Sequence, residues 1–232
     1  MEDQVQRLVD KAWTRFQAVP PDQRLMIAIS GIPGSGKTTL SQTVTNALNQ
    51  KHQSQHPGSK PVAAFCPMDG YHLTREQLSA MPDPVNAHAR RGAEFTFDGH
   101  AFLALVKALR ARSTIYAPSF DHAVKDPKEN DIPLRAHHRI VVFEGNYVCL
   151  NKEPWREAAG LMDERWFVEV DFAVARSRLV KRHVKAGIAA DEIEAGKRAD
   201  ENDLVNGREI VDNKVDIDEV VYSREDAGWK HE

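Results

Sequence analysis

The residues best suited to chemistry lie in one short loop, whose sequence GIPGSGKT runs from Gly31 to Thr38. In a G-x-x-x-x-G-K-T loop the glycines permit backbone conformations that turn successive N–H groups toward phosphate oxygens. A helix-like segment follows and would add the positive end of its dipole. We expect Lys37 to reach the β- and γ-phosphates and Thr38 to hold Mg²⁺. The predicted nucleotide-binding set is Gly31, Ile32, Pro33, Gly34, Ser35, Gly36, Lys37, Thr38 and Thr39.

A loop of this kind serves hydrolases as well as kinases, so other motifs have to separate the two. A GTPase interpretation has one candidate guanine-reading motif, the NKVD of residues 213–216, but no Asp-x-x-Gly follows a strand in the central region. An ATP-driven machine is expected to end a strand in Asp or Asp-Glu, whereas the run RIVVF (139–143) ends in a lone Glu144. Phosphate transfer is therefore favoured, with a nucleotide hydrolase or GTPase and a nucleotide-dependent regulatory protein as alternatives.

The elements that must position this loop are strands and helices in alternation. Buried strands are predicted at 25–29, 61–67, 139–143 and 166–170. Helices are predicted at 2–17, 37–49, 74–81, 173–186 and 189–201, and from Asp98 to about residue 109. Residues 51–60 and about 117–138 are expected to be loops, with a short edge strand at 113–116 and a final strand within 210–222.

Strands that alternate with helices predict a doubly wound α/β fold with a parallel sheet and right-handed crossovers. Ligands bind such sheets at the carboxyl ends of the strands. The glycine-rich loop, Asp69, Glu144 and Asp171 all fall at such ends. The sequence therefore predicts one active site at this edge of the sheet.

Composition narrows the class of protein further. The chain has 232 residues and a net charge of −3, which indicates a single globular domain and gives no bulk electrostatic case for nucleic acid or membrane partners. Its two cysteines lie in apolar runs and are expected to be buried and reduced, which suits the cytoplasm. No secretory signal or membrane-spanning run is expected. The apolar stripe of residues 2–17 could pack on its own core or on another subunit, which leaves a homodimer open.

Five further segments carry a family resemblance. They read PMDGYHL (67–73), RRGAEFTFD (90–98), YAPSFDH (116–122), VVFEGNYV (141–148) and RSRLVKRHVKAG (176–187). Together they resemble the superfamily of uridine kinase, phosphoribulokinase and bacterial-type pantothenate kinase, over residues 25–206. The resemblance implies an ATP- and Mg²⁺-dependent P-loop kinase that phosphorylates a hydroxyl of a small metabolite. It also implies a helical lid at about 172–205.

The resemblance assigns roles to four residues outside the loop. Asp69 is implied to be the catalytic base, and a carboxylate near Mg²⁺ can accept the proton of an attacking hydroxyl; the alternative is a turn former in Asp-Gly. Glu144 is implied to lie near Mg²⁺ or its waters. Arg178 and Arg182 match the lid arginines, and their spacing of four puts both on one helix face. The alternative for the arginines is a solvated basic face.

The acceptor site is implied to lie in the remaining matching loops. Its predicted residues are Tyr71, His72, Arg90, Arg91, Phe120, Asp121 and His122. Arg91 could clamp an anion or a hydroxyl. Lys125 stands where the uridine kinases carry a histidine that contacts the nucleoside, so a nucleoside, a pantothenate-like acid and a sugar all remain open as acceptors.

Overall fold

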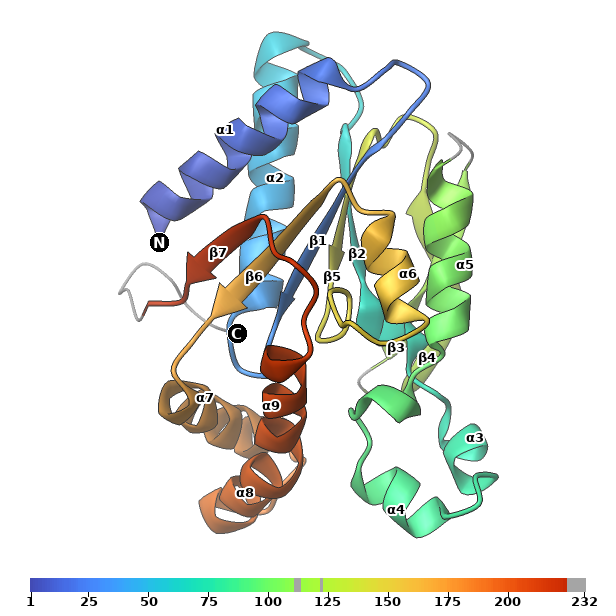
Figure 1. Ribbon diagram of the computed structural model, residues 1–232, viewed down its shortest axis with the longest axis vertical. Coiled ribbons are helices and arrows are strands. Elements are labelled where there is room, and N and C mark those ends of the chain that lie inside the picture. Colours follow the sequence, from blue (N-terminus) through green and yellow to red (C-terminus); the bar gives the residue numbers. More distant parts are fainter. Residues whose placement is uncertain (111–113, 122, 225–232) are drawn as a thin grey trace.

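The computed structural model describes residues 1–110, 114–121 and 123–224, and its centre is a five-stranded sheet (Figure 1). In spatial order the strands are β2 (Ala63–Pro67), β5 (Ile140–Glu144), β1 (Leu25–Gly31), β6 (Glu164–Glu169) and β7 (Glu219–Tyr222). All neighbouring strands run parallel. Because β1 lies between β5 and β6, the chain leaves the central strand in both directions, which confirms the predicted doubly wound α/β class.

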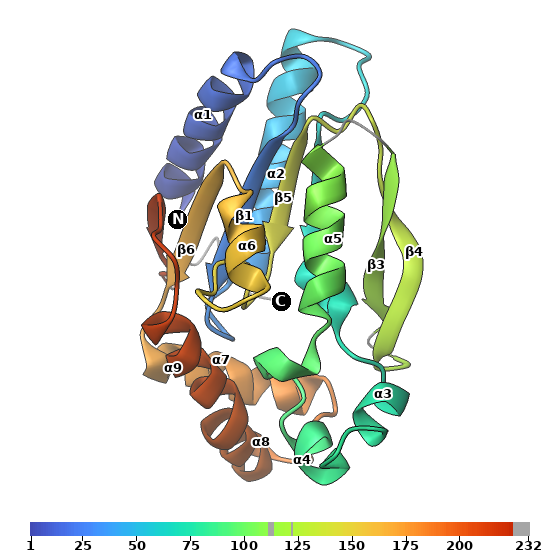
Figure 2. The same ribbon diagram turned by 45° about the vertical axis from the view of Figure 1, so that its right-hand side comes forward.

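Both faces of the sheet are apolar and covered by helices. One face carries α1 (Glu2–Ala18) and α2 (Lys37–Gln55), and the other carries α5 (Gly99–Arg110) and α6 (Trp155–Gly160) (Figures 1 and 2). Successive side chains of a strand point to opposite faces. Along β1, Leu25 and Ile27 accordingly join the core under α1 and α2, while Met26 and Ala28 join the other core. This double burial holds the carboxyl end of β1, and the loop after it, in one place.

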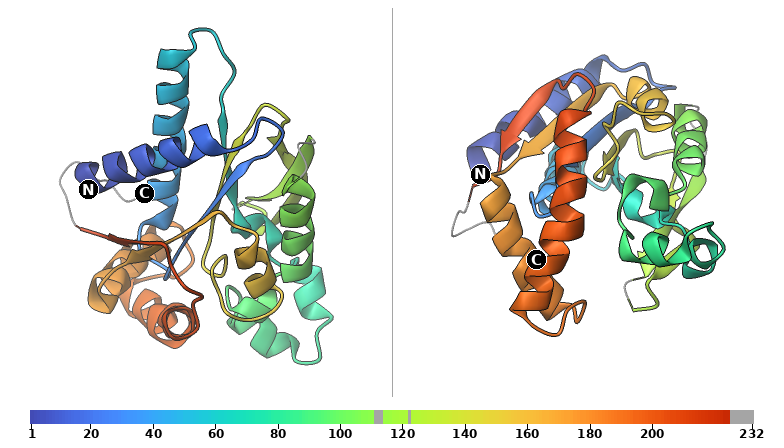
Figure 3. Two further views of the ribbon diagram at one scale, coloured as in Figure 1. Left: turned by 45° about the horizontal axis from the view of Figure 1, so that its top comes forward. Right: turned by 60° about the horizontal axis from the view of Figure 1, so that its bottom comes forward.

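Two groups of helices lie beyond the carboxyl ends of the strands (Figures 2 and 3). The lid segment consists of α7 (Phe172–Lys185), α8 (Glu192–Arg198), a π-helical turn (Ala199–Asp203) and α9 (Leu204–Asp212). The acceptor-side segment, residues 68–98, contains the 3-10 turn η1 (Met68–Tyr71), α3 (Arg75–Ser79), α4 (Pro84–Ala89) and the 3-10 turn η2 (Glu94–Thr96). The site lies between these two groups and the sheet.

Several boundaries differ from the predictions. Helix α2 continues to Gln55 through residues expected to form a loop, and Ile210 lies in α9, so that only 219–222 form the final strand. The predicted loop at 117–138 contains a hairpin of β3 (Ile115–Asp121) and β4 (Asp126–Leu134). The polar residues at 126–131 of this two-stranded sheet are mostly exposed, so the sequence lacks the apolar alternation by which a strand is predicted. Residues 111–113, on which part of the predicted edge strand falls, lie outside the described residues.

The N-terminal helix packs on its own chain. Val5, Leu8 and Trp13 are buried against the core under α1 and α2. Lys11 and Arg15 also reach the fully buried Glu164 carboxylate of β6, at 3.1 and 2.6 Å. Of the two predicted alternatives for this stripe, the structure therefore has the intramolecular one. No described helix is long and apolar enough to cross a bilayer.

Candidate active site

The loop between β1 and α2 is shaped by two glycines. Gly34 and Gly36 have φ angles of 81° and 86°, which residues with a Cβ rarely adopt. A Cβ at Gly34 would also lie 2.7 Å from the carbonyl oxygen of Ala175 in α7. Gly36 is the N-cap of the 19-residue helix α2, so the loop lies at the positive end of a long helix dipole. This arrangement suits a bound polyphosphate.

Lys37, Thr38 and Glu144 meet beside this loop, at the end of β5. The Thr38 hydroxyl donates to a Glu144 carboxylate oxygen at 3.2 Å, and Lys37 Nζ lies 3.4 Å from the carbonyl oxygen of Ile32. Burial raises the pKa of Glu144 to about 7, although the charge of Lys37 opposes the shift. Burial also lowers the pKa of Lys37, and here Glu144 opposes. Phosphate oxygens near Lys37 would stabilise its charged form.

Helix α7 brings further cations to the same place. Arg178 donates to the carbonyl oxygen of Gly34 at 3.2 Å and to the Ser223 hydroxyl at 2.9 Å. Arg182, one turn later, is exposed and interacts electrostatically with Lys37 and Glu144. The loop and α7 line a cavity of about 320 Å³. Its cationic lining residues are Lys37, Arg178, Lys181, Arg182 and Lys185. Such a concentration of positive charge matches the chemistry of a nucleotide's phosphates.

Asp69 lies in η1, directly after β2, and is half-buried. Its carboxylate interacts electrostatically with both Lys37 and Glu144. The next residue has to be glycine, because a Cβ at Gly70 would lie 2.1 Å from the carbonyl oxygen of Pro118. The close approach of the β3–β4 hairpin at Gly70 thus fixes the backbone that carries Asp69. Both sequence interpretations of Asp69, as a base and as part of an Asp-Gly turn, agree with this geometry.

An aromatic and cationic group lies on the acceptor side of Asp69. The His72 ring lies between Phe97 and Phe120, with ring-centroid distances of 4.0 and 4.7 Å. His72 Nδ1 is hydrogen-bonded to the main-chain carbonyl oxygen of Asp69 at 2.8 Å. The Arg91 guanidinium lies over the Phe120 ring at 5.6 Å. These side chains come from η1, the loop after α4 and the hairpin, so the acceptor-side segment and the hairpin form one surface.

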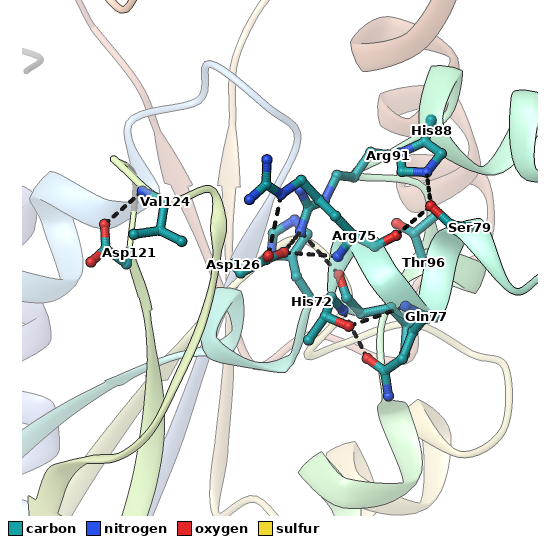
Figure 4. A network of polar contacts seen from close by, with 12 residues as sticks. His72, Arg75, Gln77, Ser79, His88, Arg91, Thr96, Asp121, Val124 and Asp126 are labelled. Atoms are coloured by element: carbon teal, nitrogen blue, oxygen red, sulfur yellow. Dashed lines mark hydrogen bonds and ion pairs between the residues drawn. The ribbon is translucent and has the colours of Figure 1, made fainter.

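Much of the charge on this surface is paired internally, as Figure 4 shows. Arg91 donates to the carbonyl oxygen of Leu73 at 3.0 Å and to the Asp126 carboxylate at 3.1 Å. Arg75 binds the same carboxylate through its main-chain N–H and its guanidinium, at 2.9 and 3.2 Å. Arg91 Nε is nevertheless buried without a partner among the described residues. Arg91 is therefore oriented by Asp126 and Phe120 and keeps one donor unused.

The other predicted acceptor residues have different positions. Tyr71 is buried and packs edge-on against Phe102, so its ring belongs to the hydrophobic core. The Asp121 carboxylate accepts from the N–H groups of Ala123 and Val124, at 2.8 and 3.0 Å, and closes the hairpin turn (Figure 4). Arg90 turns toward the lid segment. The predicted His122 lies outside the described residues.

Sequence reasoning missed the contribution of the π-helical turn. Asp203 interacts electrostatically with Lys37 and pairs with the buried ring of His183 at 2.9 Å. No motif in the sequence marks Asp203, which is the last residue of the π-helical turn.

Two other sequence candidates have structural roles. Asp171, one of the predicted strand-end residues, caps α7 by accepting from the N–H groups of Ala173 and Val174. In the NKVD motif, Asn213 and Lys214 donate back to carbonyl oxygens of α9.

Comparisons with known proteins identify a family and several similar proteins. A family model described as the phosphoribulokinase and uridine kinase family matches residues 26–205. An ATP-dependent kinase-like protein of Aspergillus versicolor is 53% identical over 159 residues, which cover 66% of this chain and 92% of that protein. A Schizosaccharomyces pombe protein provisionally named a uridine kinase is 41% identical over 201 residues, covering 86% of this chain and 83% of that protein.

A solved structure is also similar over nearly the whole chain. It is a Silicibacter protein provisionally named a fructose transport system kinase, with a TM-score of 0.79 and 30% identity. The similarity covers 92% of this chain and 98% of that one. All three names describe a kinase, and two of them add a compound, uridine in one and fructose transport in the other.

Proposed function

Since this chain belongs to the phosphoribulokinase and uridine kinase family and is an ATP-dependent kinase, we propose that it transfers the γ-phosphate of ATP to a hydroxyl of a small metabolite. The observation that carries the proposal is the convergence of Lys37, Thr38, Glu144 and Asp69 at the strand ends, beside a cationic cavity. We further propose that it acts in the cytoplasm.

The phosphate side would bind and orient the nucleotide. The loop N–H groups and Lys37 hold the β- and γ-phosphates, and Arg178 and Arg182 balance charge on the transferring group. Mg²⁺ is commonly held by one or two side chains together with phosphates and water. The hydrogen-bonded pair of Thr38 and Glu144 fits that requirement. Bound there, Mg²⁺ would neutralise charge on the β- and γ-phosphates.

Asp69 would remove the acceptor proton. The acceptor oxygen forms a bond to the γ-phosphorus, while the bond from that phosphorus to the bridging β–γ oxygen breaks and ADP leaves. The hydroxyl proton passes to the Asp69 carboxylate, which later releases it to water. A carboxylate that faces both Lys37 and Glu144 is well placed for this step.

The acceptor would lie against His72, Arg91 and Phe120. The stacked rings offer an apolar and aromatic wall, and the unused Arg91 Nε–H offers a donor. A nucleoside, a pantothenate-like acid and a sugar each have a hydroxyl that this surface can present to Asp69. The names of the relatives add uridine and fructose as specific candidates.

A binding and product screen tests the proposal. Thermal shifts with uridine, pantothenate and fructose, each with and without Mg²⁺ and ADP, would identify acceptors that stabilise the native state. Incubation with ATP or GTP followed by mass spectrometry would then identify the products. We expect ADP and a phosphorylated acceptor in equal amounts. Release of ADP and inorganic phosphate at a rate independent of every acceptor would favour the hydrolase alternative instead.

A further inference from the structure

One arginine makes two of the hydrogen bonds that join the described residues of the lid segment to the acceptor-side segment. Arg90 follows α4, and its Nε donates to Asn202 Oδ1 at 2.9 Å while its Nη2 donates to Asn206 Oδ1 at 2.7 Å. Asn202 returns a bond from its Nδ2 to the carbonyl oxygen of Arg91 at 3.1 Å. Asn202 and Asn206 are 4% and 1% exposed, so their buried side-chain oxygens receive donors from Arg90 in place of water.

The residues beside Asn202 tie the π-helical turn to α7. Asp200 accepts two bonds from the Arg176 guanidinium, at 2.7 and 2.8 Å. Asp203 pairs with His183, which is 3% exposed. A π-helical insertion changes the directions in which successive side chains point, and such insertions are frequent at functional sites. Here three residues of one five-residue turn connect to partners on two sides of the site.

Helix α7 in turn rests on the phosphate loop. The carbonyl oxygen of Ala175 lies so close to Gly34 that a Cβ there would be 2.7 Å away, and Arg178 donates to Gly34. A continuous chain of contacts therefore runs from Arg90 through the π-helical turn and α7 to the loop. Arg90 itself does not line the phosphate cavity.

We propose that Arg90 is a positioning residue that holds the π-helical turn, and through it the cations of α7, over the phosphate loop. The consequence is that nucleotide affinity depends on an arginine of the acceptor side that does not touch the nucleotide. The inference rests on the proposed function in one respect, namely that the nucleotide phosphates bind at residues 31–39. It also reassigns Arg90, which was predicted from the sequence to bind the acceptor.

The geometry demands arginine rather than a generic cation. One planar guanidinium reaches two amide oxygens with a fixed fork of donors, whereas a lysine ammonium is a point charge on a flexible stem. Without the fork, one of the buried amides is left without its donor, and the turn loses its fixed position. Binding of the nucleotide would then have to order α7 as well, which weakens the apparent affinity.

Nucleotide binding without any acceptor tests this inference directly. Calorimetry with a non-hydrolysable β,γ-imido analogue of ATP and Mg²⁺ would give Kd for wild type, Arg90→Ala and Arg90→Lys. We expect Kd to rise roughly fivefold or more for Arg90→Ala and nearly as much for Arg90→Lys, because the two-pronged contact is lost in both. The matched control is Arg75→Ala, which removes another acceptor-side arginine whose guanidinium donates to Asp126 of the neighbouring hairpin. Its Kd should stay at the wild-type value.

The outcomes separate the explanations. If Arg90 only contacts the acceptor, or only adds to global stability, the folded variants will bind the analogue as wild type does, and the inference is overturned. Equal weakening by Arg75→Ala would overturn it as well. Melting temperatures measured in parallel show whether each variant is folded. If Arg90→Ala does not fold, the comparison with wild type is made with Arg90→Lys.

A second variant extends the test to the other end of the contact. Asn206→Leu should weaken analogue binding, and its effect should be less than additive with that of Arg90→Ala in the double variant, because Arg90→Ala already breaks the contact to Asn206. Fully additive effects would contradict the inference. If wild type fails to bind the analogue at all, the proposed function falls together with the inference, whereas wild-type binding that Arg90 does not influence removes the inference alone.

Discussion

The phosphate side and the acceptor side of this site are built in different ways. On the phosphate side the main chain forms much of the site, because Gly34 and Gly36 shape a loop at the N-terminal end of α2. Cations of α7 line the cavity beside this loop. On the acceptor side the side chains bind one another, with Arg91 on Asp126 and Arg90 on two buried asparagines. The phosphate side therefore offers donors and cations suited to an anion, whereas the acceptor side is held in shape by its own hydrogen bonds.

This difference explains why the chemistry can be inferred more readily than the acceptor. Phosphate recognition follows from backbone geometry and charge, which a short motif specifies. Acceptor recognition depends on which donors remain after the internal pairing, such as Arg91 Nε. Variants on the two sides should accordingly differ in which kinetic parameter they change.

Lys37→Ala should have the largest effect. It removes the cation of the phosphate loop that reaches toward the transferring group, so kcat with ATP should fall by roughly 10³-fold or more. The fold should survive, because the Lys37 side chain makes one long hydrogen bond within the described residues, to the carbonyl oxygen of Ile32. Lys51→Ala is the matched control on the same helix, since Lys51 pairs with Asp10 at the surface. Steady-state kinetics with near-normal turnover of the Lys37 variant would refute the assignment of the phosphate side.

Arg182→Ala should come next, with a loss in kcat of roughly 10- to 100-fold and a smaller loss of nucleotide affinity. Arg182 is exposed over Lys37 and Glu144, where charge on the transferring group would develop. Arg178→Ala should behave similarly, with a further loss of kcat because its hydrogen bond to the carbonyl oxygen of Gly34 in the phosphate loop is also lost. Pre-steady-state rates and Kd measured side by side decide the point. If both parameters stay within a factor of two, these arginines form only a solvated basic face.

Arg91→Ala should change the other parameter. We expect KM for the acceptor to rise about tenfold, the range for one lost charge-assisted hydrogen bond, while nucleotide Kd stays constant. Arg75→Ala leaves Arg91 in contact with Asp126 and is the appropriate control. A change in nucleotide Kd without a change in acceptor KM would show that Arg91 acts on nucleotide binding and not on acceptor binding.

Glu144→Gln should change how stability depends on pH, measured without metal or nucleotide. The native pKa of Glu144 is raised by burial from 4.5 to about 7, so the native state holds more protons than the unfolded state between these values. Stability from this group is therefore present at low pH and lost as pH rises through 7, by at most about 3 kcal/mol. In EDTA, the melting temperature of wild type relative to Glu144→Gln should fall by several degrees between pH 5 and pH 8.5. A pH-independent difference would show that the carboxyl titrates normally.

The sequence predicted the parts of the molecule whose pattern is local. The four buried strands and the loop after Gly31 depend on periodicity and one motif, and they are confirmed in the structure. The hairpin of β3 and β4 was missed because β4 carries a run of exposed polar and charged residues without apolar alternation. The buried Cys66 and Cys149 thiols were predicted correctly from their apolar surroundings.

Long-range partners could not be predicted in this way. The roles of Arg90 and Asp203 depend on contacts to Asn206 and His183, and only the folded chain brings these residues together. Asp121 matched an acceptor motif, yet it caps a turn whose existence the sequence did not indicate. Motif positions are therefore informative about main-chain geometry and weaker about the direction of a single side chain.

In the proposed mechanism the two sides meet at Asp69, which would take the acceptor proton without taking part in nucleotide binding. Asp69→Asn keeps the shape of the side chain and one oxygen that can accept a hydrogen bond, but the amide cannot take up the hydroxyl proton at neutral pH. The direct measurement is kcat for transfer to the acceptor, beside nucleotide Kd and melting temperature, for this variant and wild type. We predict that kcat falls by about 10²–10⁴, the usual contribution of a positioned base, while Kd and melting temperature stay close to wild type. Unchanged kcat would contradict the account and leave Asp69 as a turn former beside Gly70.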